Sequence, residues 1–132
     1  MPLLRDAGAA GKGRVFSQYP HYSVDGPAGH QNPQSVMGYS MRTAEWRYTE
    51  WLKFDCDPND PMAACAAAAA VAPQWGERVG VELYDHQNDP ASDFGTHENA
   101  NLANKPEHAE PVAALHKELV AGWSPPEPPV QA

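Results

Sequence analysis

The sequence predicts an α+β fold, in which a small antiparallel sheet of about four strands carries a C-terminal helix packed on one face. Two observations lead to this prediction. The central part of the chain alternates in side-chain character with a period of two residues and is rich in aromatic residues, which is typical of strands. The last third of the chain instead repeats large apolar residues at helical spacing.

The stretch VMGYSMRTAEWRYTEWLKF, Val36–Phe54, predicts a β-hairpin with a tight reversal near Ala44. In its first strand, one face would hold Met37, Tyr39, Met41 and Thr43, and the other Val36, Gly38, Ser40 and Arg42. In its second strand, one face would hold Trp46, Tyr48, Leu52 and Phe54, and the other Arg47, Thr49, Trp51 and Lys53. Since Trp46 and Trp51 fall on opposite faces, one of the two is either core under the helix or an exposed aromatic platform.

Two further strands are predicted outside the hairpin. Arg14–Tyr22, RVFSQYPHY, reads as a short strand that Pro20 stops. Its continuation, Ser23–Ser35, is rich in Gly, Pro and Asn and reads as a loop. Glu77–His86, ERVGVELYDH, reads as a strand with alternating Val79, Val81 and Leu83.

A helix is predicted from Asn104 onward. Asn104 and Glu107 have capping-box spacing, and Pro106 suits a first helical turn. The apolar stripe of this helix would consist of Val112, Leu115, Leu119 and Trp123.

Two residues modify the predicted helix. Pro111 removes a backbone hydrogen bond, so the helix is expected to restart there. Gly122 is expected to stop the helix just before Trp123.

Composition limits the partners and the location of the chain. With 132 residues the chain is one domain by length. Its net charge of -8 argues against nucleic acid as a partner, and no stretch has the ~20 apolar residues that a membrane span needs. No secretory signal is recognisable at the N-terminus, which bears on secretion only if Met1 is the true start, so the localisation stays open.

The predicted domain covers residues 1–123, with a variable Ala-rich insert at residues 55–75. Residues 124–132, rich in Pro, are expected to form a flexible tail. Cys56 and Cys65 both lie in the insert, where two thiols can pair but say little about the compartment.

Several motifs for chemistry fail on inspection. The run DCDPND has Asp60 and Ala66 where a calcium-binding EF-hand loop needs Gly and Glu. His86, His97 and His108 recur every eleven residues, a spacing that favours loop and cap histidines over a metal site. No serine nucleophile elbow and no glycine-rich phosphate loop is present.

Arg42 has two interpretations. It shares its predicted face with small residues, so it can receive an anionic ligand or another chain segment. The alternative is a structural ion pair with a neighbouring carboxylate such as Glu45.

Four motifs, in order, carry a family resemblance: FSQYP, MGYSMRTAEWRYTEW, ELYDHQNDP and NLANKPEHAEPVAALHKELVAGW. Together they resemble the C-terminal subdomain of formylglycine-dependent sulfatases, with most similarity to the iduronate-2-sulfatase-like branch, over roughly Leu3–Trp123. Two departures are Trp46, where the family has Tyr, and a longer spacer between Pro90 and Asn101.

The resemblance implies that the chemistry lies in a separate N-terminal α/β domain. There the family matures a Cys or Ser in a C-x-P-x-R or S-x-P-x-R motif to formylglycine and binds a calcium-type divalent ion. In this chain CDPND has Asp60 at the position of the required Arg. We therefore assign no catalytic residue, metal ligand or cofactor to this chain and expect it to be inactive alone.

The resemblance also implies partners and a rim for a substrate pocket. The expected partner is a sulfatase catalytic domain, in the same or a separate chain, and a sulfated glycan is the implied substrate. The candidate rim residues are Gln18, Tyr19, His21, Tyr39 and Arg42. Family members are often periplasmic, secreted or lysosomal.

Three interpretations of function remain. The chain is a C-terminal subdomain or fragment of a sulfatase, packed on the catalytic domain. Alternatively, it is a free-standing, non-catalytic module that binds a glycan or another protein. The third interpretation is a plain α+β domain whose motifs serve only folding.

Overall fold

The structure is a computed structural model that describes residues 12–23, 32–55, 73–89 and 97–123. Its strands are β1 (Arg14–Ser23), β2 (Asn32–Thr43), β3 (Trp46–Asp55) and β4 (Arg78–Asp85). A short 3-10 helix, η3 (Pro106–His108), leads directly into α2 (Ala109–Trp123).

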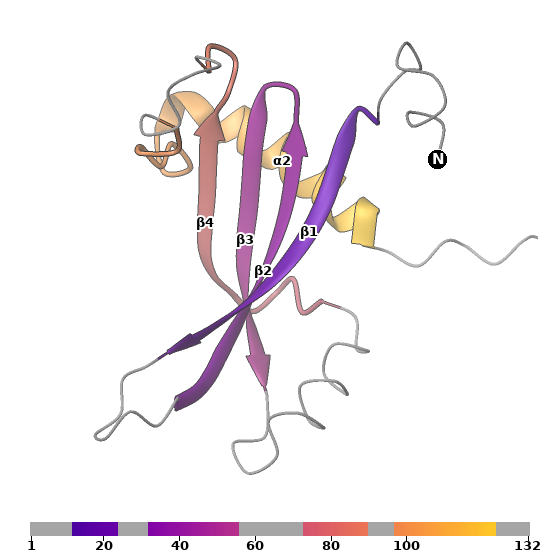
Figure 1. Ribbon diagram of the computed structural model, residues 1–132, viewed down its shortest axis with the longest axis vertical. Helices are drawn as coiled ribbons and strands as arrows, with labels where there is room; N and C mark the ends of the chain where they lie inside the picture. The colour runs from indigo at the N-terminus through magenta and orange to yellow at the C-terminus, as the bar shows by residue number, and fades with distance from the viewer. Residues whose placement is uncertain (1–11, 24–31, 56–72, 90–96, 124–132) are drawn as a thin grey trace, which may run out of the picture.

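The four strands form one antiparallel sheet in the order β1-β2-β3-β4, so each strand pairs with its neighbour in sequence. Figure 1 shows α2 lying across one face of this sheet, behind the end that carries the β2–β3 reversal. The predicted α+β arrangement, about four antiparallel strands with a C-terminal helix on one face, is confirmed.

The predicted hairpin supplies the centre of the core. β2 pairs with β3 from Gln34↔Asp55 to Arg42↔Arg47, and the Thr43 hydroxyl accepts the Trp46 backbone N–H at 3.0 Å across the reversal. Cross-strand partners share a face of a sheet, so the apolar sets of the two strands combine. The buried side chains of this face are Met37, Tyr39, Met41, Tyr48, Leu52 and Phe54.

Helix α2 covers this face with the predicted stripe. Leu115 and Leu119 are buried, while Val112 and Trp123 pack against the same core. Burial of one such leucine stabilises the fold by roughly 2 kcal/mol, so the stripe fixes α2 to the sheet.

The prediction that Pro20 stops the first strand is wrong, since β1 continues through Pro20 to Ser23. β1 lies at the edge of the sheet, where a residue without a backbone N–H loses no ladder hydrogen bond if that position points outward. Because β1 is long, pairing also extends into the predicted loop, and residues 32–35 belong to β2.

The alternation predicted for β4 holds for Leu83 and Val81 but not for Val79. A register shift between Trp51 and Leu52 marks a bulge in the β3–β4 ladder. Val79 is 61% exposed and borders the face that α2 does not cover. A bulge changes which face the following side chains meet, and period-two alternation alone does not reveal it.

The start and the end of the helix differ from the prediction. The N-cap of η3 is Lys105, with no side-chain cap hydrogen bond, so Asn104 and Glu107 form no capping box. Pro111 lies in the first turn of α2, where its missing N–H is harmless, and the helix does not restart there. Gly122 is inside α2, which continues through Trp123.

The outer edge of β4 is occupied by the segment after Glu98. Asn101 accepts the Leu83 N–H at 3.0 Å and donates to the Val81 carbonyl at 2.9 Å. The Leu102 N–H donates to the Leu83 carbonyl at 2.8 Å. One asparagine and the residue after it thus satisfy backbone groups that an edge strand leaves open.

Several predictions fall outside the described residues: the Cys56–Cys65 pair, the tail at 124–132 and the DCDPND run beyond Asp55. Of the predicted insert, only its flanks are described, namely Asp55 at the end of β3 and residues 73–75. The flanking Trp75 packs against the core. Within the described ranges, no helix is long and apolar enough to cross a membrane.

Candidate functional site on the uncovered sheet face

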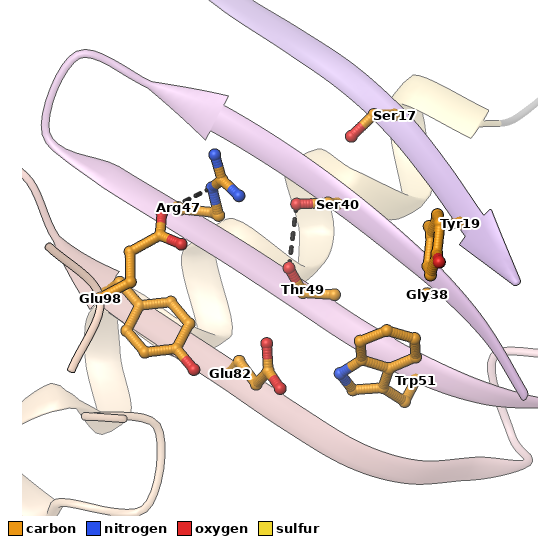
Figure 2. A pocket seen from close by; sticks show the side chains of 10 residues that line it. Ser17, Tyr19, Gly38, Ser40, Arg47, Thr49, Trp51, Glu82 and Glu98 are labelled. Atoms are coloured by element: carbon orange, nitrogen blue, oxygen red, sulfur yellow. Dashed lines mark hydrogen bonds and ion pairs between the residues drawn. The ribbon is translucent and has the colours of Figure 1, made fainter. Parts of the chain in front are cut away.

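The face of the sheet opposite α2 carries a shallow hollow of about 300 Å³ (Figure 2). All four strands and the segment after β4 contribute to it, because the register brings their outward-facing residues side by side. The hollow is lined by Ser17, Tyr19, Gly38, Ser40, Arg47, Thr49, Trp51, Glu82, Tyr84 and Glu98.

Trp51 forms one end of this hollow and rests on two glycines. In the register, Gly38 of β2 and Gly80 of β4 lie on either side of Trp51. A Cβ atom at Gly38 would lie 2.7 Å from Trp51 Cζ3, so only glycine leaves room for the indole there. The sequence thus seats a large aromatic ring against the backbone of the sheet.

The other end of the hollow is closed by an ion-pair network. Arg47 Nε lies 2.8 Å from Glu98 Oε1, and a dashed line marks this ion pair in Figure 2. His86 Nε2 lies 2.9 Å from the same oxygen. The His86 Nδ1 atom contacts the Asp89 carboxylate. This hydrogen bond from His86 lowers the pKa of Asp89 below its usual range.

Glu82 lies between the two ends, beside Trp51. No cation among the described residues lies within ion-pair distance of its carboxylate. The pKa of Tyr84 is raised, first by burial and then by the charges of Glu82 and Glu98, while the charge of Arg47 lowers it. The floor is polar but neutral, with the Thr49 hydroxyl 2.9 Å from Ser40 Oγ.

A second hollow of about 380 Å³ adjoins the first and shares Trp51 and Glu82 with it. Its other lining residues are His21, Val36, Val79 and Gly80. The ring of His21 meets Trp51 edge-on, with centroids 6.0 Å apart. Trp51 and Glu82 therefore separate two neighbouring depressions on the uncovered face.

The structure brings two of the five candidate rim residues, Tyr19 and His21, to this site. Tyr19 pairs with Gly38 and is 67% exposed, and His21 borders Trp51. Gln18 pairs with Tyr39, which places it on the helix-covered side of β1, where it is exposed.

Tyr39 lies in the core rather than at a surface. Its ring centroid is 5.4 Å from that of Trp75 and 5.1 Å from that of Trp123. The pKa of Tyr39 is raised by burial. Its role in the described structure is packing between the sheet and α2, and we do not include it in the proposed site.

Arg42 lies at the end of β2, apart from the hollow. Its guanidinium donates to the backbone carbonyls of Thr43 and Trp46, and Nη2 lies 3.9 Å from Asp89 Oδ2. The carboxylate beside Arg42 is thus Asp89, brought close by the segment after β4, and not the sequence neighbour Glu45.

Sequence reasoning did not find Glu82 or Glu98 as site residues. Glu82 lies on the polar side of β4, a strand that the sequence predicted. Only its position beside Trp51 makes it a candidate site residue. Glu98 lies 51 residues from Arg47 in sequence, so no local pattern could reveal their ion pair. The glycines at positions 38 and 80 were the available signal for the seated Trp51.

The described residues include no group of three or more His, Cys, Asp or Glu side chains arranged to hold a metal ion. Asp89 and Glu98 are the nearest candidates, but His86 occupies both carboxylates and arginines lie against them. Such a donor set, already neutralised, does not fit the calcium-type ion of the resemblance. His86 and His108 are structural in the described part of the chain, since His108 packs edge-on against Trp46 at 5.7 Å.

A four-stranded antiparallel sheet, with α2 on one face and no described helix on the other, defines the class of fold. Comparison with known proteins relates the chain to a sulfatase: it is 30% identical to mouse iduronate 2-sulfatase over 92 residues. The match covers 65% of this chain but only 14% of the length of that relative. No protein-family model matches the chain.

Proposed function

We propose that this chain is the C-terminal subdomain of a formylglycine-dependent sulfatase. In this proposal the subdomain packs on the catalytic α/β domain and contributes to the rim of the substrate pocket. The single observation that carries the proposal is the similarity to iduronate 2-sulfatase, which spans only 14% of that enzyme.

The uncovered face of the sheet supports a packing role. The described residues include three exposed large apolar side chains, Val15, Tyr19 and Val79. All three lie on or border the face opposite α2, since Val15 pairs with Arg42, Tyr19 pairs with Gly38, and Val79 lines the second hollow. In this proposal the catalytic domain covers these exposed apolar side chains.

The formylglycine and the calcium-type ion belong, in this proposal, to the catalytic domain and not to this chain. The expected substrate is a sulfate ester of a sulfated glycan. Tyr19 and His21 are the residues of this chain best placed for the rim, because both lie on the uncovered face.

The experiment that tests the proposal is the mass of the native product in its source cell. An antibody against the hairpin residues 46–51 isolates the product, and mass spectrometry determines its size and composition. We expect a chain or stoichiometric complex well above 14.3 kDa that contains a C-x-P-x-R or S-x-P-x-R peptide with formylglycine. A 14.3 kDa product without such a partner would contradict the proposal.

A second candidate function is a free-standing module that binds a glycan without catalysis. The observation that favours it is the seated Trp51 beside hydroxyl-bearing side chains, since aromatic rings with polar neighbours suit sugar rings. The charge of the hollow disfavours a sulfated sugar, because Arg47 is already paired with Glu98 and the carboxylate of Glu82 has no cation partner among the described residues. A screen of neutral and sulfated oligosaccharides against the 14.3 kDa chain tests this alternative.

A further inference from the structure

We propose that the uncovered face docks a protein surface that inserts a basic side chain, Arg or Lys, between Trp51 and Glu82. The inference rests on the proposed function in one respect, namely that a protein covers this face. It adds the chemistry of the contact, which neither the similarity nor the fold assigns.

The first argument is charge. The carboxylate of Glu82 is half-buried and has no cation partner among the described residues. Arg47, the cation that lines the same hollow, is held by Glu98 at 2.8 Å. A half-buried carboxylate becomes costly when a partner surface excludes water, unless that partner supplies a positive charge.

The second argument is the aromatic ring beside that carboxylate. Trp51 lies between Gly38 and Gly80 of the neighbouring strands, and the ring of His21 meets it edge-on at 6.0 Å. Trp offers the most favourable face for a cation, and guanidinium groups stack on it particularly well. A planar guanidinium can contact the indole and pair with the Glu82 carboxylate in the same position.

The third argument is the surroundings of the pair. Tyr19 and Val79 flank the two hollows and are 67% and 61% exposed. Such an apolar border around one charged contact resembles the anatomy of protein interfaces, in which a central anchor is shielded from water. The net charge of -8 further favours a partner with a basic surface.

The test uses the full 132-residue chain and blocked tripeptides as probes. Acetylated and amidated Gly-Arg-Gly and Gly-Lys-Gly are titrated against the neutral Gly-Gln-Gly. The readout is the NMR signal of the Trp51 indole N–H, assigned as the signal missing in W51F. We expect the cationic probes to shift this signal and the neutral probe to leave it in place.

Two variants make the test specific. E82Q keeps the shape of the side chain and removes its charge, and we expect it to weaken binding of the Arg probe by roughly tenfold. E110Q is the matched control, because Glu110 is an exposed residue of α2 on the other side of the sheet. It is expected to bind as the unmodified chain does.

Three results would overturn the inference: equal shifts from Gly-Gln-Gly, unchanged affinity in E82Q, or a stronger response to a neutral or heparin-derived disaccharide. The last would favour the glycan module instead. Because the probes meet this chain alone, the outcome is independent of the native mass. Probe binding together with a 14.3 kDa native product would retain this inference and remove the sulfatase proposal.

Discussion

Glu50 is a fully buried carboxylate between the sheet and α2. Its Oε1 atom accepts from the Tyr48 hydroxyl at 2.6 Å and from His116 Nδ1 at 2.5 Å, and Arg78 Nη1 lies 3.7 Å away. Its Oε2 atom has no hydrogen-bond partner among the described residues. A buried charge is tolerated only with such partners, so His116 and Arg78 tie α2 and β4 to the centre of β3.

Removing the His116 side chain is expected to destabilise the fold. H116A leaves the buried carboxylate of Glu50 with the Tyr48 hydroxyl and a more distant arginine, and we expect a loss of about 2 kcal/mol in the free energy of unfolding. Urea denaturation measures this loss, with K117A as the control because Lys117 is an exposed neighbour on the same helix. Equal effects of the two variants would show that Glu50 does not depend on His116.

Tyr48 makes the stability depend on alkaline pH. Burial raises the pKa of Tyr48 above its usual range, and the Glu50 carboxylate raises it further. Because the folded-state pKa is higher, the stabilisation is fully present below the unfolded pKa of about 10 and is lost as pH rises above it.

We expect Y48F to reduce this dependence. Above pH 10 the unmodified chain should lose stability with a slope up to about 1.4 kcal/mol per pH unit steeper than that of Y48F. Urea denaturation at pH 8 to 11.5 measures both slopes. Parallel curves would mean that the Tyr48 phenol ionises as readily in the folded chain as in the unfolded one.

The sequence predicted the buried face of β3 but not the charge within it. Glu50 has the same parity as Tyr48 and Leu52, so the register alone places it inward. The buried carboxylate of Glu50 is stabilised by His116, which lies 66 residues further along the chain. No local sequence pattern predicts a partner at that distance. The packing of Trp51 against Gly38 and Gly80 was not predictable for the same reason, since the two glycines belong to two other strands.

At the scale of elements, α2 and β1 approach each other closely at Gly122. A Cβ atom at this position would overlap the ring of Phe16, so the glycine permits the contact. The ring of Phe16 also meets Trp123 edge-on at 6.5 Å. Gly122, which the sequence suggested as a helix stop, therefore serves packing between the last turn of α2 and the edge strand.

We expect G122A to destabilise the fold when Phe16 is present and to stabilise it when Phe16 is replaced by alanine. Alone, G122A should destabilise the fold by about 1–2 kcal/mol, because the new methyl group displaces the Phe16 ring. In an F16A background the same change should stabilise by up to about 1 kcal/mol, since alanine is the better helix former. Thermal unfolding of the four chains gives the coupling energy, and additive effects would contradict the contact.

Most element boundaries followed from pattern, and the exceptions have physical causes. The hairpin and the helical stripe were predictable because burial of one face imposes periods of two and 3.6 residues. The prediction that Pro20 stops the first strand failed because an edge strand tolerates proline better than a central strand does. Whether β1 lies at an edge depends on the order of all the strands in the sheet, which the local sequence does not show. Val79 misled because of the bulge opposite Trp51 and Leu52.

At the scale of the whole molecule, the two faces of the sheet differ. One is closed by α2 over an apolar core, and the other exposes Tyr19, Val15 and the Trp51–Glu82 pair. The described residues offer no metal-binding group, and the sequence has no C-x-P-x-R or S-x-P-x-R motif. In the proposed function, the nucleophile and the charge stabilisation that a sulfuryl transfer needs come from the catalytic domain.

We therefore expect no sulfatase activity from the 132-residue chain alone. Incubation of the purified chain with an aryl sulfate and Ca²⁺ should release no sulfate above the protein-free control. An active arylsulfatase in the same buffer verifies the assay. Release of sulfate that depends on both the chain and Ca²⁺ would place catalytic residues in this chain. It would contradict the proposal that these residues lie in a separate catalytic domain.

The two edges of the sheet differ in how their backbone groups are hydrogen-bonded. Asn101 and Leu102 occupy backbone groups of Val81 and Leu83, whereas no described residue pairs with the outer side of β1 at the opposite edge. Endless growth by strand addition requires two open edges in every molecule. Within the described residues, β1 is therefore the edge at which a second copy can pair, β1 to β1, and the hydrogen bonds of Asn101 and Leu102 disfavour further addition at β4.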